Sequence, residues 1–355
     1  MKTYKRLWEE LISDQNIETA IHRASLGNKD KRMKEKLRRM ERKKEYYIPF
    51  FREYAKNYHN DPHVPVQIYD GISRKQRTII VPTAKEQVIH HMVVQTIKPV
   101  FMKSMYKHSY GSIPGRGCHL AKKQLEKWLP SKYVLKIDIH HYFESIDQDV
   151  LISKLERIIK DERMMELLKT IIRVLPQGIP LGFYTSQWFA NFYLTSLDHY
   201  ITSELGFGKL IRYMDDMTIL GNSKKKLRQL KNKIEEYLKT LGLKLKSNWQ
   251  IFRFDYIANG RRKGRDIDFM GFRFYRDKTT LRRSIMLKAT RKANRINKKP
   301  KATWYDAAQM LSYTGYFRST DTRGCFEKYI KSKVSIKSLK RKVSRHSKCT
   351  TLNYC

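Results

Sequence analysis

The sequence predicts an α+β fold whose sheet is largely antiparallel. Short apolar bursts alternate with stretches of helical spacing along most of the chain. Of the 355 residues, 41% are hydrophobic and 12% aromatic, which is enough for a sizeable core and excludes general disorder. The apolar runs are far shorter than the roughly 18 residues that cross a bilayer, so we expect a soluble, cytoplasmic protein without a membrane partner.

The charge of the chain indicates a polyanionic partner. Lys and Arg number 74 against 34 Asp and Glu, which leaves a formal net charge of +40. So many like charges repel one another unless a polyanion or salt compensates them, and nucleic acid gains further from the release of counterions. The alternative is a surface whose charge serves solubility alone.

Residues 1–60 predict a basic helical extension. Apolar side chains recur at helical spacing in two short segments, at Leu7 and Leu11 and then at Ile17 and Ile21. Residues 29–45 hold ten basic and four acidic residues. Such a run forms either a solvated helix face or a surface that binds phosphates.

Along residues 61–280, segments in which apolar residues alternate as in strands are interspersed with segments of helical spacing. Alternating apolar residues around the turn Asp70-Gly71 predict a β-hairpin over 66–82, with Arg74, Lys75 and Arg77 near its tip. Further strands are predicted at 133–139, 210–220, 250–257 and 267–275. Helical patterns lie at 85–105, 119–129, 149–173, 183–203 and 224–240.

Residues 281–355 form a strongly basic module. Residues 282–355 contain 20 Lys and Arg but 3 Asp and Glu, so 17 of the 40 excess positive charges lie in these 74 residues. Apolar positions such as Trp304, Leu311 and Phe317 predict a few helices. The stretch after Arg341 is expected to be frayed.

Asp215 and Asp216 are the first candidate catalytic residues. They are adjacent inside an apolar, strand-like segment, and Asp is a poor strand residue that suits a hairpin turn. Two carboxylates this close raise each other's pKa unless a cation lies between them, so a divalent metal is the simplest explanation. The alternative is a surface turn with two solvated aspartates.

Asp138 is the third candidate. It follows an apolar strand that begins at Tyr133, where a single Asp is usually a cap or a hydrogen-bonded core residue. Together with Asp215 and Asp216 it makes the smallest ligand set for two Mg²⁺ ions about 4 Å apart, the arrangement that stabilises the attacking and leaving oxygens in phosphoryl transfer.

The ordered motifs resemble those of reverse transcriptases. Tyr213-Met214-Asp215-Asp216 is similar to the YxDD motif of that family, and the matching segments run from about 66 to 280. The resemblance implies a right-hand polymerase, with fingers and palm over 61–280 and a small helical thumb and tail over 281–355. It implies an RNA-directed DNA polymerase that extends a DNA or RNA primer on an RNA template with dNTPs. Asp138, Asp215 and Asp216 would hold two Mg²⁺, or Mn²⁺, with the carbonyl of Ile139.

The resemblance also assigns roles to residues around these aspartates. The hairpin cations would hold the triphosphate, Arg77 first and Lys75 second, through paired phosphate oxygens. Phe143 would be the aromatic gate that excludes a ribose 2′-hydroxyl. The remaining implied contacts are Gln187 with the dNTP, Leu181, Gly182 and Ser186 with the templating base pair, and Met270 and Gly271 with the primer.

One segment indicates a subfamily. Ser186-Gln187 stands where retroviral and group II intron enzymes usually have Ser-Pro, and the segment is similar to that of the reverse transcriptases of diversity-generating retroelements. Those enzymes copy a template-repeat RNA into cDNA with errors opposite adenine, and work with a small basic accessory protein. The alternatives are a reverse transcriptase of another bacterial class, from phage defence or an intron, and a non-catalytic RNA-binding protein on the same fold.

Trp249 departs from the family pattern. Related polymerases place a lysine there to protonate the leaving pyrophosphate, and this chain has Trp249 instead. Lys244 and Lys246 are the possible substitutes, so the general acid stays open.

Overall fold

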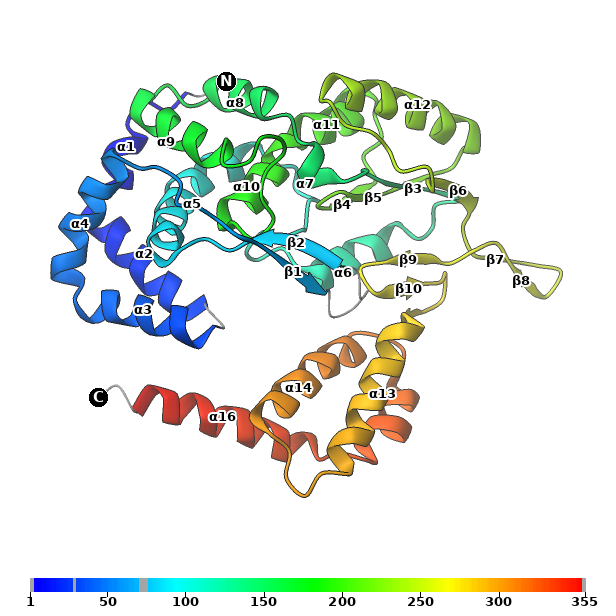
Figure 1. Ribbon diagram of the computed structural model, residues 1–355. Coiled ribbons are helices and arrows are strands. Elements are labelled where there is room, and N and C mark those ends of the chain that lie inside the picture. Colours follow the sequence, from blue (N-terminus) through cyan, green and yellow to red (C-terminus); the bar gives the residue numbers. More distant parts are fainter. Residues whose placement is uncertain (1–2, 28–29, 70–75, 353–355) are drawn as a thin grey trace. The chain divides into compact units, whose positions relative to one another are not determined.

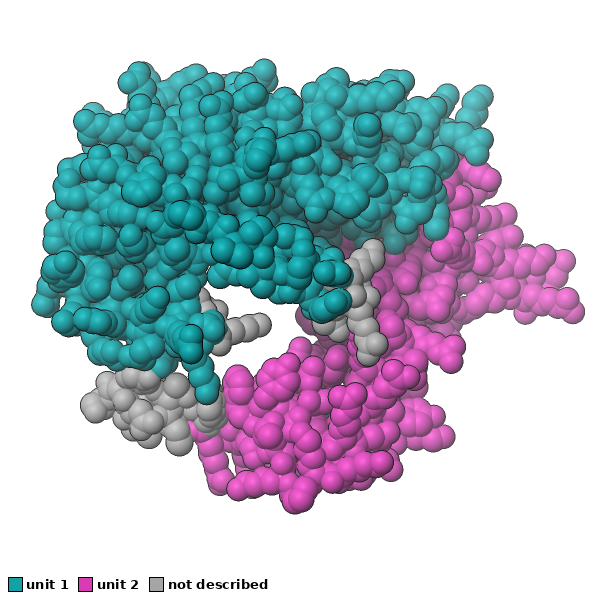
Figure 2. Space-filling model, in the orientation of Figure 1, with its two compact units in different colours: residues 1–117, 135–219, 225–250 teal, residues 118–134, 220–224, 251–355 magenta. Residues whose placement is uncertain are grey.

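The computed structural model describes residues 3–27, 30–69 and 76–352 (Figure 1). The chain divides into two compact units, shown in different colours in Figure 2. Unit 1 comprises residues 1–117, 135–219 and 225–250, and unit 2 comprises residues 118–134, 220–224 and 251–355. The predicted α+β class is confirmed, because both units combine helices with short strands.

Unit 1 begins with four helices rather than two short ones. They are α1 (Leu7–Leu11), α2 (Asp14–Gly27), α3 (Lys31–Arg42) and α4 (Lys44–Lys56). The charged run over 29–45 contains α3, which begins where the Asp30 side chain accepts a hydrogen bond from the amide of Met33 at 2.8 Å. Leu37 and Met40 of α3 are buried, so this helix has an apolar face that the dense charge conceals in the sequence.

The predicted hairpin is present. Strands β1 (Pro65–Tyr69) and β2 (Gln76–Ile80) pair antiparallel, with Tyr69 opposite Gln76, while the turn itself, with Arg74 and Lys75, lies outside the described residues. Helix α5 (Ala84–Ser104) follows and begins with a capping box between Thr83 and Glu86. It packs against α2 (Figure 1).

A four-stranded sheet with the order β4-β5-β3-β6 positions the candidate aspartates. Its strands are β3 (Tyr133–Asp138), β4 (Leu210–Tyr213), β5 (Asp216–Gly221) and β6 (Gln250–Arg253), and β4 and β5 form an antiparallel hairpin. The helices that lie between these strands along the sequence are α7 (Tyr142–Ser145), α8 (Gln148–Glu156), α9 (Glu162–Ile172), α10 (Tyr184–Tyr193), α11 (Thr195–His199), the π-helix η1 (Tyr200–Glu204) and α12 (Lys224–Thr240). Helix α10 is buried along nearly its whole length.

Unit 2 combines short strands with the basic helices. It contains a three-stranded sheet of β9 (Ile267–Phe269), β10 (Phe272–Phe274) and β11 (Thr279–Leu281). It also contains helix α6 (Cys118–Trp128) and the separate strand pair β7 (Tyr256–Ala258) and β8 (Arg261–Lys263). Helices α13 (Arg283–Asn297), α14 (Trp304–Arg318), α15 (Arg323–Phe326), η2 (Glu327–Lys331) and α16 (Ile336–Leu352) follow.

The expected fraying after Arg341 is wrong. Helix α16 continues to Leu352 and packs against α14. Within the described ranges, no helix is both long enough and apolar enough to cross a membrane.

Candidate active site

The turn between β4 and β5 carries Asp215 in a strained backbone. Tyr213 and Asp216 pair across the hairpin, so Met214 and Asp215 form a two-residue loop. Met214 has a φ of 56°, in the left-handed region that is disfavoured for a residue with a side chain and costs about 1–3 kcal/mol. The surroundings must therefore hold this turn in place.

Gly111 and Asn191 provide part of that support. A Cβ on Gly111 would lie 2.6 Å from the backbone nitrogen and from Cγ of Met214, so the turn can approach only a glycine. Asn191 Nδ2 donates to the carbonyl of Gly111 at 2.8 Å and lies 3.3 Å from Met214 Sδ. The amide of Asn191 thus connects the segment at Gly111 to the turn of Met214 and Asp215, which is called the catalytic turn below because it carries a candidate catalytic residue.

A buried ion pair supplies the rest of the support. Arg212 and Asp198 are both fully buried, and Arg212 donates from Nε to Asp198 Oδ1 at 2.8 Å and from Nη2 to Oδ2 at 2.6 Å. Nη1 of Arg212 donates to the carbonyl of Met214 at 3.1 Å. Burial raises the pKa of Asp198, against the attraction of Arg212. Burial acts to lower the pKa of Arg212, but the attraction and hydrogen bonds of Asp198, together with the charges of neighbouring groups, raise it overall, so the guanidinium keeps its charge.

Asp138 and Asp215 come together because β5 and β3 are neighbours in the sheet. Burial raises the pKa of Asp215 to about 7, and the charge of Asp138 and a hydrogen bond between the two carboxyls raise it in the same direction. Asp138 Oδ2 accepts a hydrogen bond from Lys246 Nζ at 2.6 Å. Asp138 Oδ1 is buried and has no hydrogen-bond partner among the described residues.

These features fit a hard divalent cation. Two neighbouring carboxyls, one of which has a buried oxygen that no described residue hydrogen-bonds, gain stability when a cation replaces the proton that Asp215 would otherwise retain. The described residues contain no group of three or more His, Cys, Asp or Glu side chains that could hold a metal. The structure therefore assembles two of the three predicted carboxylates, and Asp216 lies beside them as the first residue of β5.

Lys246, one of the two substitutes for the missing lysine, lies in this site. The backbone of its segment pairs with the end of β3, since the Lys246 amide donates to the carbonyl of Asp138 at 2.8 Å. Lys244 is exposed. Trp249 is half-buried, and its ring lies 4.8 Å from Lys231 Nζ in a cation–π contact.

The other predicted contact residues differ in their accessibility. Arg77 is exposed on β2, Phe143 is half-buried in α7, and Gln187 is exposed on α10. Ser186, one residue earlier, is buried with 2% exposure, so its hydroxyl is not on the surface of unit 1. Lys75 lies outside the described residues.

Leu181 and Gly182 are held against the hairpin. The Ile80 amide donates to the carbonyl of Leu181 at 2.7 Å. Gly182 has a φ of 115°, and a Cβ there would lie 2.1 Å from the Ile80 carbonyl oxygen. The backbone of this segment therefore anchors β2, whatever else it contacts.

Met270 and Gly271 form the turn between β9 and β10 in unit 2. Their φ values are 52° and 86°, the two positive values that a tight primed hairpin turn requires.

Sequence reasoning missed the residues that hold the catalytic turn, namely Gly111, Asn191, Asp198 and Arg212. One signal was available: Arg212 is a charged residue within an apolar strand, and a buried charge requires a buried partner. The identity of that partner is set by the tertiary fold.

The comparison with known families decides the identity. The family model for reverse transcriptase (RNA-dependent DNA polymerase) matches residues 67–274. The chain belongs to the reverse transcriptase family. The predicted RNA-directed DNA polymerase is thereby confirmed at the level of the family.

Bacterial reverse transcriptases are among the similar proteins. The retron Ec73 reverse transcriptase of Escherichia coli is 26% identical over 256 residues, which cover 66% of this chain and 80% of that protein. The group II intron-encoded protein LtrA of Lactococcus lactis subsp. cremoris is 26% identical over 140 residues, covering 36% of this chain and 23% of that protein.

Telomerase structures are among the solved structures that the chain matches. A structure of telomerase from Candida albicans with a TWJ fragment of telomeric RNA covers 81% of this chain and 61% of that chain, at 12% identity and a TM-score of 0.49. Apo telomerase from Candida tropicalis covers 74% of this chain and 55% of that chain, at 13% identity and the same TM-score of 0.49.

Gly111→Ala is expected to displace the catalytic turn of this reverse transcriptase, because the added Cβ would collide with the Met214 backbone at 2.6 Å. We expect primer extension to fall at least about tenfold, since a shift near 1 Å in a reacting group can cost about 100-fold. Gly117→Ala is the matched control, because no heavy atom lies within 4 Å of its added Cβ. Equal activity of the two folded variants would contradict the role of Gly111.

Asp198→Asn is expected to lower the free energy of unfolding by about 3–5 kcal/mol, because it leaves the Arg212 charge buried without compensation. Urea unfolding followed by circular dichroism measures the change. Asp149→Asn is the control: it breaks a 3.0 Å pair with Arg173 in which the Asp149 side chain is 83% exposed, and should cost less than about 1 kcal/mol. Similar losses in both variants would argue against the ion pair as a structural anchor.

Proposed function

We propose that this chain extends a primer 3′-hydroxyl along an RNA template by transferring nucleotidyl groups from dNTPs. The observation that carries the proposal is the close approach of the carboxyls of Asp138, at the end of β3, and Asp215, in the turn between β4 and β5, in a chain of the reverse transcriptase family. A silent RNA-binding scaffold gains nothing from retaining two repelling carboxylates in contact.

Two Mg²⁺ ions, with Mn²⁺ as the alternative, are the proposed cofactor. Asp138 and Asp215 would hold them, with Asp216 and the Ile139 carbonyl as further ligands. The pairing of Ile139 with Leu245 uses the carbonyl of Asp138 and the amide of His140, so it leaves the Ile139 carbonyl unused. Bound ions would supply the charge that stabilises the attacking and leaving oxygens.

Lys246 is the proposed proton donor to the leaving pyrophosphate. Its ammonium lies 2.6 Å from Asp138 Oδ2, whereas an indole such as that of Trp249 is not an acid that can take this role. Pairing with Asp138 keeps the Lys246 ammonium beside the reacting groups.

The substrate contacts are proposals of the same kind. Arg77 and Lys75 would bind the triphosphate, Gln187 would contact the incoming nucleotide, and Phe143 would exclude the 2′-hydroxyl. Leu181 and Gly182 would contact the templating base pair through their backbone. Ser186, which is buried in α10, would influence the same base pair from within that helix. Met270 and Gly271 would hold the primer.

Asp215→Asn is expected to reduce primer extension on an RNA template by at least about 1,000-fold, because each ion in such a site contributes several kcal/mol to the transition state. Asp149→Asn, which alters an exposed carboxylate, should retain activity. Chelation of divalent cations should abolish extension by the native chain and magnesium should restore it. Equal incorporation by native and Asp215→Asn chains would leave the non-catalytic RNA-binding alternative.

We further propose a subtype for this chain. It would copy a template-repeat RNA with errors for a diversity-generating retroelement, together with a small basic accessory protein. This proposal rests on the segment around Ser186-Gln187. The retron relative, which covers 66% of this chain, favours the second candidate, a reverse transcriptase of another bacterial class.

Sequencing of cDNA distinguishes the two subtypes. If the retroelement proposal is right, cDNA made from the cognate RNA with the accessory protein present should carry substitutions concentrated opposite template adenines. Templates with adenines replaced by guanines serve as the control for general infidelity. Uniform error rates at all four bases would eliminate the retroelement subtype and leave the polymerase assignment intact.

A further inference from the structure

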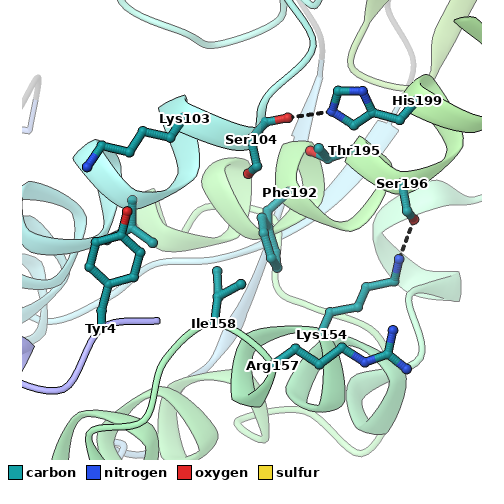
Figure 3. A pocket seen from close by; sticks show the side chains of 11 residues that line it. Tyr4, Lys103, Ser104, Lys154, Arg157, Ile158, Phe192, Thr195, Ser196 and His199 are labelled. Atoms are coloured by element: carbon teal, nitrogen blue, oxygen red, sulfur yellow. Dashed lines mark hydrogen bonds between the residues drawn. The ribbon is translucent and has the colours of Figure 1, made fainter. Parts of the chain in front are cut away.

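A cavity in unit 1 lies outside all of the residues assigned above. Its volume is about 400 Å³, within the range of small-molecule sites. It is lined by the segment at Tyr4, the end of α5, the end of α8, and the region where α10 gives way to α11 (Figure 3). Four separate parts of unit 1 thus contribute to its walls.

The N-terminal wall is fixed by the backbone. Tyr4 forms a parallel bridge with Ile159, in which its amide donates to the carbonyl of Ile158 at 2.9 Å and its carbonyl accepts from the amide of Lys160 at 2.8 Å. On the opposite wall the Phe192 ring stacks on Phe101, with centroids 4.4 Å apart and planes 12° apart. The backbone at Tyr4 and the ring of Phe192 are therefore held in defined positions.

One side of the cavity gathers positive charge. Lys154 and Arg157 both extend from the end of α8 (Figure 3), and the charge of Arg157 adds to burial in lowering the pKa of Lys154 to about 8. Lys154 Nζ donates to Ser196 Oγ. Arg157 forms no side-chain ion pair or hydrogen bond with any residue that the structure describes, and no acidic side chain is among the described residues of the lining. Two cations that repel each other beside an apolar cavity are complementary to an anion.

The rest of the lining is apolar or neutral and polar, except for Lys103, whose Nζ lies 5.4 Å from the centroid of the Tyr4 ring. Ser104, Thr195 and His199 lie on the side away from Arg157 (Figure 3), where the His199 Nε2 contacts the carbonyl of Ser104 at 2.7 Å. A ligand that suits all three regions has an anionic group at one end, a flat apolar body and hydrogen-bonding edges. A nucleotide has this combination, and Arg and Lys are the usual partners of its phosphate.

We propose that this cavity binds a nucleotide, with its phosphate at Lys154 and Arg157 and its base against Phe192 and Tyr4. The nucleotide comes either from solution or from an unpaired position of an RNA strand, because both sources present the same phosphate and base. The site is separate from the aspartates at the ends of β3 and β4, and its occupancy is measurable without any polymerase reaction.

Photolabelling tests the proposal on the full chain in the absence of divalent cations. The two probes are 8-azidoadenosine 5′-monophosphate and a single-stranded RNA with one 8-azidoadenosine. Labelled peptides that contain Tyr4 or Phe192 are expected. Labelling there by the mononucleotide identifies a free nucleotide, and labelling there by the RNA probe alone identifies a nucleotide of a strand. Absence of label from these peptides with both probes would overturn the proposal.

Affinity measurements with matched variants test the phosphate contact, using whichever probe labels the cavity. Arg157→Glu should weaken binding at least about tenfold, since a charge-assisted hydrogen bond is replaced by repulsion. Lys160→Glu makes the same charge change three residues away, at an exposed residue outside the lining, and should leave binding within about twofold. Equal affinities of the two variants, or competition by inorganic phosphate as strong as that by the nucleotide, would contradict the site.

Discussion

The buried ion pair between Arg212 and Asp198 is the interaction on which the catalytic turn depends. Arg212 is the last buried residue of β4, and two of its nitrogens are used by Asp198. The third, Nη1, reaches the carbonyl of Met214. A lysine has a single nitrogen and cannot hold a carboxylate bidentately while it also supports the turn, so the planar guanidinium is what this position requires.

The active site meets two opposing electrostatic demands. A chain with a net charge of +40 attracts polyanions, yet its candidate reaction centre consists of neighbouring carboxyls. Lys246 reconciles the two locally, because its ammonium neutralises one oxygen of Asp138, while the other oxygen is buried and has no hydrogen-bond partner in the part of the chain that the structure describes. The carboxylate pair is therefore only half compensated by the chain itself, which leaves it receptive to an external cation.

The sequence was sufficient for the features that depend on local pattern and order along the chain. Strand periodicity placed Asp138 at the end of β3 and Asp215 in a hairpin turn, and both positions follow from which residues tolerate a turn. Asn191 and Asp198 could not be found in this way, since their roles arise from contacts with β4 that the spacing of residues does not encode. The same limit applies to the frayed end that was expected at α16 and to α3, where dense charge conceals buried residues such as Leu37.

Helix α10 contributes residues both to the support of the Met214 turn and to the wall of the cavity. Gln187 is exposed near its start, Asn191 holds the Met214 turn from the next turn of the helix, and Phe192 borders the cavity. Adjacent residues on a helix point about 100° apart, so Asn191 and Phe192 face different surroundings although they share one backbone. Because α10 is buried along nearly its whole length, a displacement of this helix on the cavity side also displaces the residues that pack against its other side. The helix that fixes the catalytic turn is therefore also a wall of the proposed nucleotide site.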